Sequence, residues 1–227
     1  MWLPCHGEPL SEAVVHVWRV DLRGDHAALA QHLSPQEREQ AGRFVRPQDQ
    51  ECYTISHAAL RDILGRHLQA PPPLEFRVGP QGKPSVGTGG WEFNLSHSGR
   101  CALVAVSWQR TVGVDVEWIR HDVEILSIAD RFFTAAESAE LHRLSALPRT
   151  QAFFRLWTRK EAYMKATGLG MSLEPTSFEV WPALRVPVDR AAALRWSLSD
   201  LEPGEGYAGA LVAAAPAVPV QLWDWSP

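Results

Sequence analysis

The spacing of apolar and polar positions along the chain predicts alternating groups of helices and strands. Residues 14–20 alternate around β-branched positions and predict a strand, and further strands are predicted at residues 74–78, 92–95, 102–108, 113–119, 178–181, 195–199, 207–214 and 220–225. Apolar positions at helical spacing favour helices at residues 34–44, 49–68, 123–133 and 150–167, with a further start at 134. Because most strands follow one another at hairpin-like intervals, the pattern indicates an α+β fold rather than a doubly wound parallel sheet.

Two of the predicted helices begin with the same signal. The segments Ser34-Pro-Gln-Glu37 and Thr134-Ala-Ala-Glu137 both match a capping box, in which the first and fourth residues bond each other's backbone amides. Their positions hint at an internal repeat, although capping boxes are common. A chain of 227 residues has room for one large domain or two small ones.

Composition and charge narrow the class of protein. The 22 basic and 26 acidic residues give a formal net charge of -4, without the basic excess of a nucleic-acid-binding domain. The three cysteines are too far apart for a zinc ligand pair or a disulfide framework. The N-terminal residues lack the pattern of a signal peptide, and the most apolar stretch, 207–223, is interrupted by two prolines and predicts two core strands. We therefore expect a cytoplasmic protein that binds neither membrane nor nucleic acid.

Lysine is rare in this chain. Only three of the 22 basic residues are lysine, namely Lys83, Lys160 and Lys165. A chain that uses arginine by default can keep lysine where a compact ammonium is needed, because the two side chains differ in geometry and acidity. Codon bias and chance are the alternative explanation, and the count alone leaves both open.

The segment Gly113-Val-Asp-Val-Glu117 carries the first candidate chemistry. Asp115 and Glu117 alternate with valines on a predicted strand, so both carboxylates project from one face. Such a pair suits a hard cation such as Mg²⁺, which takes carboxylate oxygens and keeps its remaining positions for water or phosphate. A half-buried strand with an ordinary polar outer face explains the segment equally well.

Two further segments bear groups suited to a phosphate. Glu161 and Lys165 share one face of a predicted helix, where they either form an ion pair worth about 0.2–0.5 kcal/mol or complete a metal site. In the segment 93–99, Ser96 and His97 end a strand with hydrogen-bond donors, although a histidine there is often a turn residue. The turn around Lys83 lacks the spacing and following helix of a P-loop, and the glycines at 168 and 170 indicate a helix end.

In this order the motifs resemble those of the 4′-phosphopantetheinyl transferases, and they look like the stand-alone surfactin-synthetase type. They are Gly82-Lys-Pro84, Phe93-Asn-Leu-Ser-His-Ser98, Gly113-Val-Asp-Val-Glu117 and Trp157-Thr-Arg-Lys-Glu-Ala-Tyr-Met-Lys165. The resemblance is closest from about residue 82 to residue 173. It implies two similar α+β halves, residues 1–110 and 111–227, that form a pseudo-dimer within one chain, with the metal ligands in the second half.

The resemblance also implies an activity. The phosphopantetheine arm of coenzyme A is transferred to a serine hydroxyl of an apo acyl or peptidyl carrier protein, which releases adenosine 3′,5′-bisphosphate. Asp115, Glu117 and Glu161 fall on Mg²⁺ ligands, and Lys165 on a phosphate contact that stabilises the leaving bisphosphate or protonates it. The resemblance also implies that Glu161, directly or through a water, activates the serine. The coenzyme A contacts implied by the motifs are Lys83, Ser96 and His97.

The chain departs from the surfactin-type pattern in its first predicted helix. Glu37 and Gln40 stand where that type has lysines, so we assign the 3′-phosphate to Arg43 or Arg46. We also expect a monomer with an exposed apolar patch near Phe132 and Phe133 for the carrier protein. The residues alone leave two alternatives open, which are another Mg²⁺-dependent transferase or hydrolase of a nucleotide diphosphate and a carrier-binding module without activity.

Overall fold

The computed structural model describes residues 1–5, 11–68, 74–79, 82–86, 90–186 and 196–227. Its strands are β1 (Leu3–Pro4), β2 (Val15–Asp21), β3 (Phe76–Val78), β4 (Pro84–Val86), β5 (Trp91–Ser98), β6 (Cys101–Trp108), β7 (Val112–Trp118), β8 (Trp196–Leu201), β9 (Tyr207–Ala214) and β10 (Val220–Asp224). Its helices are α1 (His26–Leu29), α2 (Pro35–Gly42), α3 (Pro47–Leu68), α4 (Ile125–Phe132), α5 (Ala135–Arg143) and α6 (Ala146–Thr167), with 3-10 turns η1 (Ala30–His32), η2 (Gly170–Ser172) and η3 (Pro175–Ser177).

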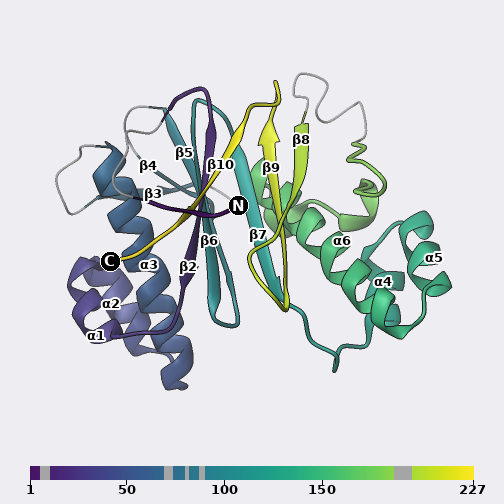
Figure 1. The fold of residues 1–227 in the computed structure, drawn as a ribbon, viewed down its shortest axis with the longest axis horizontal. Helices are drawn as coiled ribbons and strands as arrows, with labels where there is room; N and C mark the ends of the chain where they lie inside the picture. The colour runs from purple at the N-terminus through teal and green to yellow at the C-terminus, as the bar shows by residue number, and fades with distance from the viewer. Residues whose placement is uncertain (6–10, 69–73, 80–81, 87–89, 187–195) are drawn as a thin grey trace.

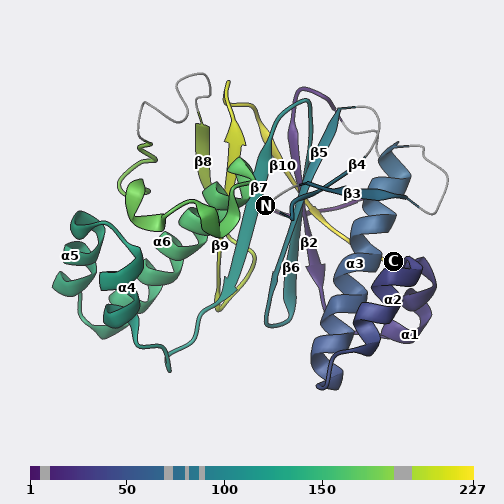
Figure 2. The ribbon, with the colours of Figure 1, turned by 180° about the vertical axis from the view of Figure 1, so that it is seen from behind.

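Two sheets face each other between two long helices (Figures 1 and 2). The larger sheet has the strand order β1-β10-β2-β6-β5 and the smaller one β7-β9-β8, while β3 and β4 form a separate hairpin. Strand β10 runs parallel to β2, whereas β6 is antiparallel to both β2 and β5. The predicted pair of core strands in residues 207–223 is therefore confirmed as β9 and β10, but the two strands belong to different sheets.

Alternation along the strands separates three cores. On β2, Trp18 and Val20 pack against α3, and Val15 and Val17 face the smaller sheet. On β9, Ala210 and Val212 pack under α6 while the residues between them face the larger sheet. Each sheet thus buries one face against its helix and the other face against its neighbour, as the period of two requires.

The predicted α+β class is confirmed, and so are both capping boxes. Ser34 and Glu37 bond each other's backbone amides, and Thr134 and Glu137 do the same. Helix α6 ends at Gly168, which has the left-handed φ of 69° that glycine adopts without strain. It begins at Ala146, four residues before the predicted start.

The strand predicted at 178–181 is wrong. The segment contains only an isolated bridge between Glu179 and Arg185. Its backbone groups are bound by side chains instead, since Lys160 donates to the Phe178 carbonyl at 2.8 Å and the Val180 amide donates to Glu137 at 2.6 Å. With Phe178 and Val180 bonded to side chains, backbone pairing of this segment is limited to the two bonds between Glu179 and Arg185.

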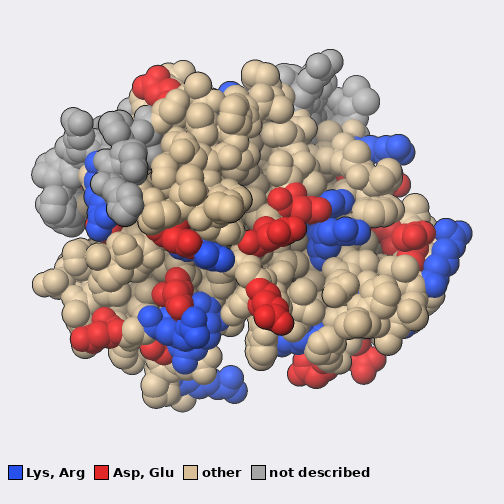
Figure 3. Space-filling model, in the orientation of Figure 1, with Lys and Arg blue, Asp and Glu red and all other residues tan. Residues whose placement is uncertain are grey.

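The end of the chain returns to the first half of the molecule. The indole Nε1 of Trp225 donates to Asp62 of α3 at 2.8 Å, and β10 lies within the larger sheet. The division after residue 110 stays a prediction. On the face seen in Figure 3, basic and acidic side chains are interspersed. Within the described residues, no helix is both long and apolar enough to cross a bilayer.

Candidate active site

Strands β5 and β7 meet along a seam that contains the candidate residues. Amides of β7 donate to side chains of β5 at three successive alternate positions, Val114 to Asn94 (2.8 Å), Val116 to Ser96 (3.4 Å) and Trp118 to Ser98 (3.1 Å). Strand β7 is the edge of its sheet, so these amides have no backbone ladder on this side. Side chains of β5, in the larger sheet, thus accept the hydrogen bonds that the backbone of a neighbouring strand would otherwise accept.

Helix α6 lies directly on β7 because Gly113 has no side chain. A Cβ atom at Gly113 would lie 2.2 Å from the Ala162 carbonyl oxygen and 2.3 Å from the Ala166 amide nitrogen. This approach places the helix face that bears Glu161 and Lys165 over the strand that bears Asp115. The side chains that share one face of β7 and one face of α6 therefore form a single site only because the two elements are in contact at Gly113.

Asp115 is the centre of the polar network. Its side chain is only 4% exposed, and its Oδ1 accepts hydrogen bonds from Lys165 Nζ at 2.6 Å and Ser96 Oγ at 2.7 Å. Its second oxygen, Oδ2, is buried and has no hydrogen-bond partner among the described residues. Glu117 Oε2 accepts a hydrogen bond from Ser98 Oγ at 2.7 Å.

Burial raises the proton affinity of all three carboxylates of the site. Burial raises the pKa of Asp115, and Lys165 opposes that shift. Burial and the charge of Asp115 raise the pKa of Glu117, while burial followed by the charges of Asp115 and Glu117 raises the pKa of Glu161. One ammonium, that of Lys165, faces three carboxylates, so the site favours a further cation.

The donor set fits a hard divalent cation. Among the described residues no group of three or more His, Cys, Asp or Glu side chains is arranged as a metal site. The ammonium of Lys165 and the hydroxyl of Ser98 instead bind one oxygen each of Asp115 and Glu117. The buried, unpartnered Oδ2 of Asp115 and the oxygen-only chemistry nevertheless match what Mg²⁺ takes.

Comparison with known proteins identifies the family. A sequence profile described as the 4′-phosphopantetheinyl transferase superfamily matches residues 111–212. The 4′-phosphopantetheinyl transferase HetI of Nostoc sp. is 36% identical over 220 residues, which cover 93% of this chain and 92% of the relative. The chain belongs to the 4′-phosphopantetheinyl transferase family. The resemblance drawn from the motifs, and with it the transferase activity from coenzyme A to a carrier protein, is confirmed.

Two further comparisons extend the match. The 4′-phosphopantetheinyl transferase Sfp of Bacillus subtilis is 29% identical over 198 residues, covering 84% of this chain and 86% of the relative. Among solved structures, a holo-(acyl-carrier-protein) synthase from Bacillus anthracis aligns at 22% identity and a TM-score of 0.40. That alignment covers 46% of this chain and 94% of the other.

The three lysines of this transferase have different surroundings. Lys165 lies in the site, whereas the Nζ of Lys160 is buried and donates to the Pro175 and Phe178 carbonyls and to Glu137. Burial lowers the pKa of Lys160. Of these two lysines, only Lys165 pairs with a carboxylate of the site, Asp115, whereas Lys160 pairs with Glu137.

Lys83 binds backbone carbonyls of β7 and α6. Its Nζ donates to the Val112 carbonyl at 3.0 Å and to the Ala166 carbonyl at 3.4 Å, near the end of α6. Burial lowers its pKa. The hydroxyl of Ser96 is likewise occupied by Asp115, Lys165 and the Val116 amide. Contacts from these two residues to coenzyme A stay predictions.

His97 points to the opposite side of β5 from Ser96, toward α3. Its side chain is exposed. Crowding by protein atoms, followed by the positive charges of His57 and Lys165, lowers the pKa of His97. A neutral imidazole has one donor and one acceptor nitrogen. The contact of His97 with coenzyme A stays a prediction.

Glu37 has a structural role that explains the departure from the surfactin-type pattern. It accepts hydrogen bonds from Arg61 at 2.5 Å, from His57 at 3.1 Å and from the Ser34 amide. Burial raises its pKa, but these partners together lower it to about 2. Arg43 and Arg46 are exposed after α2, and Arg43 pairs with Glu39 at 2.6 Å.

The apolar patch expected at Phe132 and Phe133 needs correction. Phe133 is buried at 3% exposure and packs against Phe153, so it cannot form a surface patch. Phe132 is half-buried, with its ring edge against Trp157. Phe133 and Phe153 fill the core under α6 because burial of their large apolar area stabilises the fold.

Sequence reasoning did not single out Asn94, Ser98 or Gly113. Asn94 and Ser98 lie two residues on either side of Ser96, so the period of two already placed all three on one face of the strand. Gly113 opened a noted motif but was assigned no task. Its signal is a glycine inside a strand, which marks a close backbone approach.

Proposed function

We propose that Asp115, Glu117 and Glu161 of this transferase hold a Mg²⁺ ion together with the pyrophosphate of coenzyme A. The buried Oδ2 of Asp115, which has no partner among the described residues, carries the proposal. A desolvated carboxylate oxygen without a hydrogen bond is costly unless a cation compensates it. The pKa values of all three carboxylates are raised, which supports the binding of a cation at this site.

In the proposed reaction the serine oxygen of the carrier protein attacks the phosphorus nearest to pantetheine. A new P–O bond forms, the pyrophosphate P–O bond breaks, and adenosine 3′,5′-bisphosphate leaves. Bound Mg²⁺ supplies neutralising charge at the pyrophosphate. Lys165 stabilises the leaving bisphosphate or protonates it, and Glu161, directly or through a water, accepts the serine proton.

We further propose that the chain is an internal pseudo-dimer. The orders β2-β6-β5 and β7-β9-β8 correspond, and each half has a capping-box glutamate that pairs with a cation on the following long helix. These pairs are Glu37 with Arg61 at 2.5 Å and Glu137 with Lys160 at 2.9 Å. The seam between β5 and β7 lies between the two halves, which supports one site per chain and a monomer.

The proposed compartment is the cytoplasm, supported by cysteine spacing that fits no disulfide framework. The proposed acceptors are apo acyl or peptidyl carrier proteins.

Intact-mass spectrometry of apo carrier proteins tests the proposal. A panel of acyl and peptidyl carriers is incubated with the protein, coenzyme A and Mg²⁺, alongside Glu161→Ala and the matched control Glu140→Ala, which removes a half-buried glutamate on α5 that pairs with Arg143. We expect each accepted carrier to gain one phosphopantetheine with the wild type and the control. Chelation and Glu161→Ala should abolish the gain.

Two outcomes would contradict this function. Consumption of coenzyme A without any carrier would indicate a hydrolase. Carrier binding without consumption, and without any effect of Mg²⁺ on affinity for coenzyme A, would indicate a binding module.

A further inference from the structure

The seam repeats one two-bond pattern along β5. Ser96 Oγ accepts from the Val116 amide and donates to the carboxylate of Asp115. Two residues later, Ser98 Oγ accepts from the Trp118 amide and donates to the carboxylate of Glu117. A hydroxyl provides both functions at once, which an alanine or a backbone carbonyl does not.

The two carboxylates differ in how many groups hold them. Asp115 is bound by Ser96 and also by the ammonium of Lys165. For Glu117, the hydroxyl of Ser98 is the single hydrogen-bond donor found in the described part of the chain. The orientation of Glu117 therefore depends on one contact, and that contact comes from the opposite sheet.

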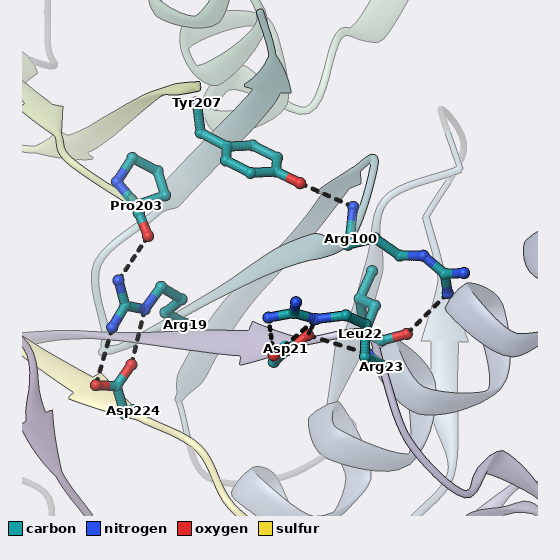
Figure 4. Close-up of polar contacts among 8 residues, drawn as sticks. All are labelled: Arg19, Asp21, Leu22, Arg23, Arg100, Pro203, Tyr207 and Asp224. Carbon is teal, nitrogen blue, oxygen red and sulfur yellow. Dashed lines mark hydrogen bonds and ion pairs between the residues drawn. The ribbon is translucent and has the colours of Figure 1, made fainter. Parts of the chain in front are cut away.

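The backbone at Ser98 is fixed independently of its side chain. The next residues form a turn whose Arg100 amide donates to the Tyr207 hydroxyl at 2.9 Å, and the Arg100 guanidinium donates to the Leu22 carbonyl (Figure 4). The guanidinium also donates to Glu51. A Cβ atom at Gly99 would lie 2.9 Å from the Tyr207 oxygen, and Gly99 has a φ of 57°. Loss of the Ser98 hydroxyl thus leaves β5 in place.

We propose that Ser98 is a positioning residue, which orients Glu117 for the divalent cation by binding its Oε2. This inference rests on the proposed function, because it takes Glu117 as a ligand of the metal. The bond occupies one oxygen of Glu117 and restrains rotation of the carboxylate, so the other oxygen keeps a fixed direction. Groups that orient a metal ligand in this way commonly change metal affinity by tenfold to a hundredfold.

Mn²⁺ binding, measured from the electron paramagnetic resonance signal of the free ion, tests the role apart from turnover. We expect Ser98→Ala to weaken Mn²⁺ binding about tenfold. Ser98→Thr, which keeps the hydroxyl, should restore wild-type affinity. The control is Ser197→Ala on β8, which also removes a strand hydroxyl bonded to a neighbouring strand, to Ala213 at 3.2 Å. It should lower the melting temperature as Ser98→Ala does and leave Mn²⁺ affinity unchanged.

The variant Asp115→Asn distinguishes a failure of the role of Ser98 from a failure of the proposed metal site. If it loses Mn²⁺ binding while Ser98→Ala binds like the wild type, the role of Ser98 is overturned and the metal site stands. Failure of Ser98→Thr to restore the affinity lost in Ser98→Ala would also overturn the role. If Asp115→Asn binds Mn²⁺ like the wild type, the proposed metal site itself is wrong.

Discussion

Because Gly113 is in direct contact with α6, we predict that a single methyl group added at this position separates the part of the active site on α6 from the part on β7. In Gly113→Ala the new Cβ would lie 2.2 Å from the Ala162 carbonyl oxygen, against about 3.4 Å for an ordinary contact of this kind. Helix α6 must therefore move from β7 by roughly 1 Å. Overpacking of this size costs about 1–3 kcal/mol of stability.

The same displacement affects catalysis because α6 carries Glu161 and Lys165, whereas β7 carries Asp115 and Glu117. A misplacement of about 1 Å between reacting groups lowers rates by up to a hundredfold. We expect Gly113→Ala to remain folded at 25 °C, with a lower melting temperature, and to lose about two orders of magnitude in kcat for carrier modification.

Carrier modification at saturating coenzyme A and a thermal melt by circular dichroism are the two measurements. Gly65→Ala on α3 is the matched control, since a Cβ there meets no atom within 4 Å. It should keep its rate and gain about 0.5–1 kcal/mol from the better helix propensity of alanine. A Gly113→Ala enzyme within twofold of the wild-type rate would refute the coupling of strand and helix through this contact.

Three further predictions concern stability and substrate binding. Glu37→Gln should cost about 3 kcal/mol at pH 7, since the shift from 4.5 to about 2 favours the folded state above pH 4.5. Urea unfolding should show that Glu37→Gln lowers the free energy of unfolding less at pH 3.5 than at pH 7, because the stabilisation from ionised Glu37 is lost as pH falls toward 2. Equal losses at the two pH values would contradict this role of Glu37. Lys160→Met should cost about 3–5 kcal/mol by leaving Glu137 buried without its cation, and adding Glu137→Gln should recover part of the loss in a double-mutant cycle. Arg43→Ala with Arg46→Ala should weaken coenzyme A, measured by calorimetry, far more than 3′-dephospho-coenzyme A, and equal losses would rule out a 3′-phosphate contact.

Local patterns were sufficient for most elements of this fold. Strand β9 has the predicted bounds, and both capping boxes form the predicted bonds, because these features depend on neighbouring residues. The segment 178–181 alternates like a strand, but the Phe178 and Val180 carbonyls are bound by α6 and the Val180 amide by Glu137 of α5. Those partners are about 20 and 40 residues away, so the local pattern contains no trace of them.

Candidate residues were predictable within an element and not between elements. The period of two placed Asp115 with Glu117, and the i,i+4 spacing placed Glu161 with Lys165. Only the motif resemblance joined the pairs, since their meeting depends on the packing of α6 against β7. The lysine count had the same limit: it singled out three ammonium groups without showing that Lys83 and Lys160 bind backbone carbonyls.

The proposed duplication gives a reason for a single set of carboxylates. Strands β2 and β7 have equal lengths and pair with β6 and β9 in the same register, so Trp18 takes the place of Asp115 and Val20 that of Glu117. Both are fully buried under α3 and add to its core. A carboxylate at either position would be desolvated without a cation, at a cost of several kcal/mol. The first half therefore keeps its helix-packing face and contributes to chemistry through the side chains of β5, which hold the carboxylates of the second half.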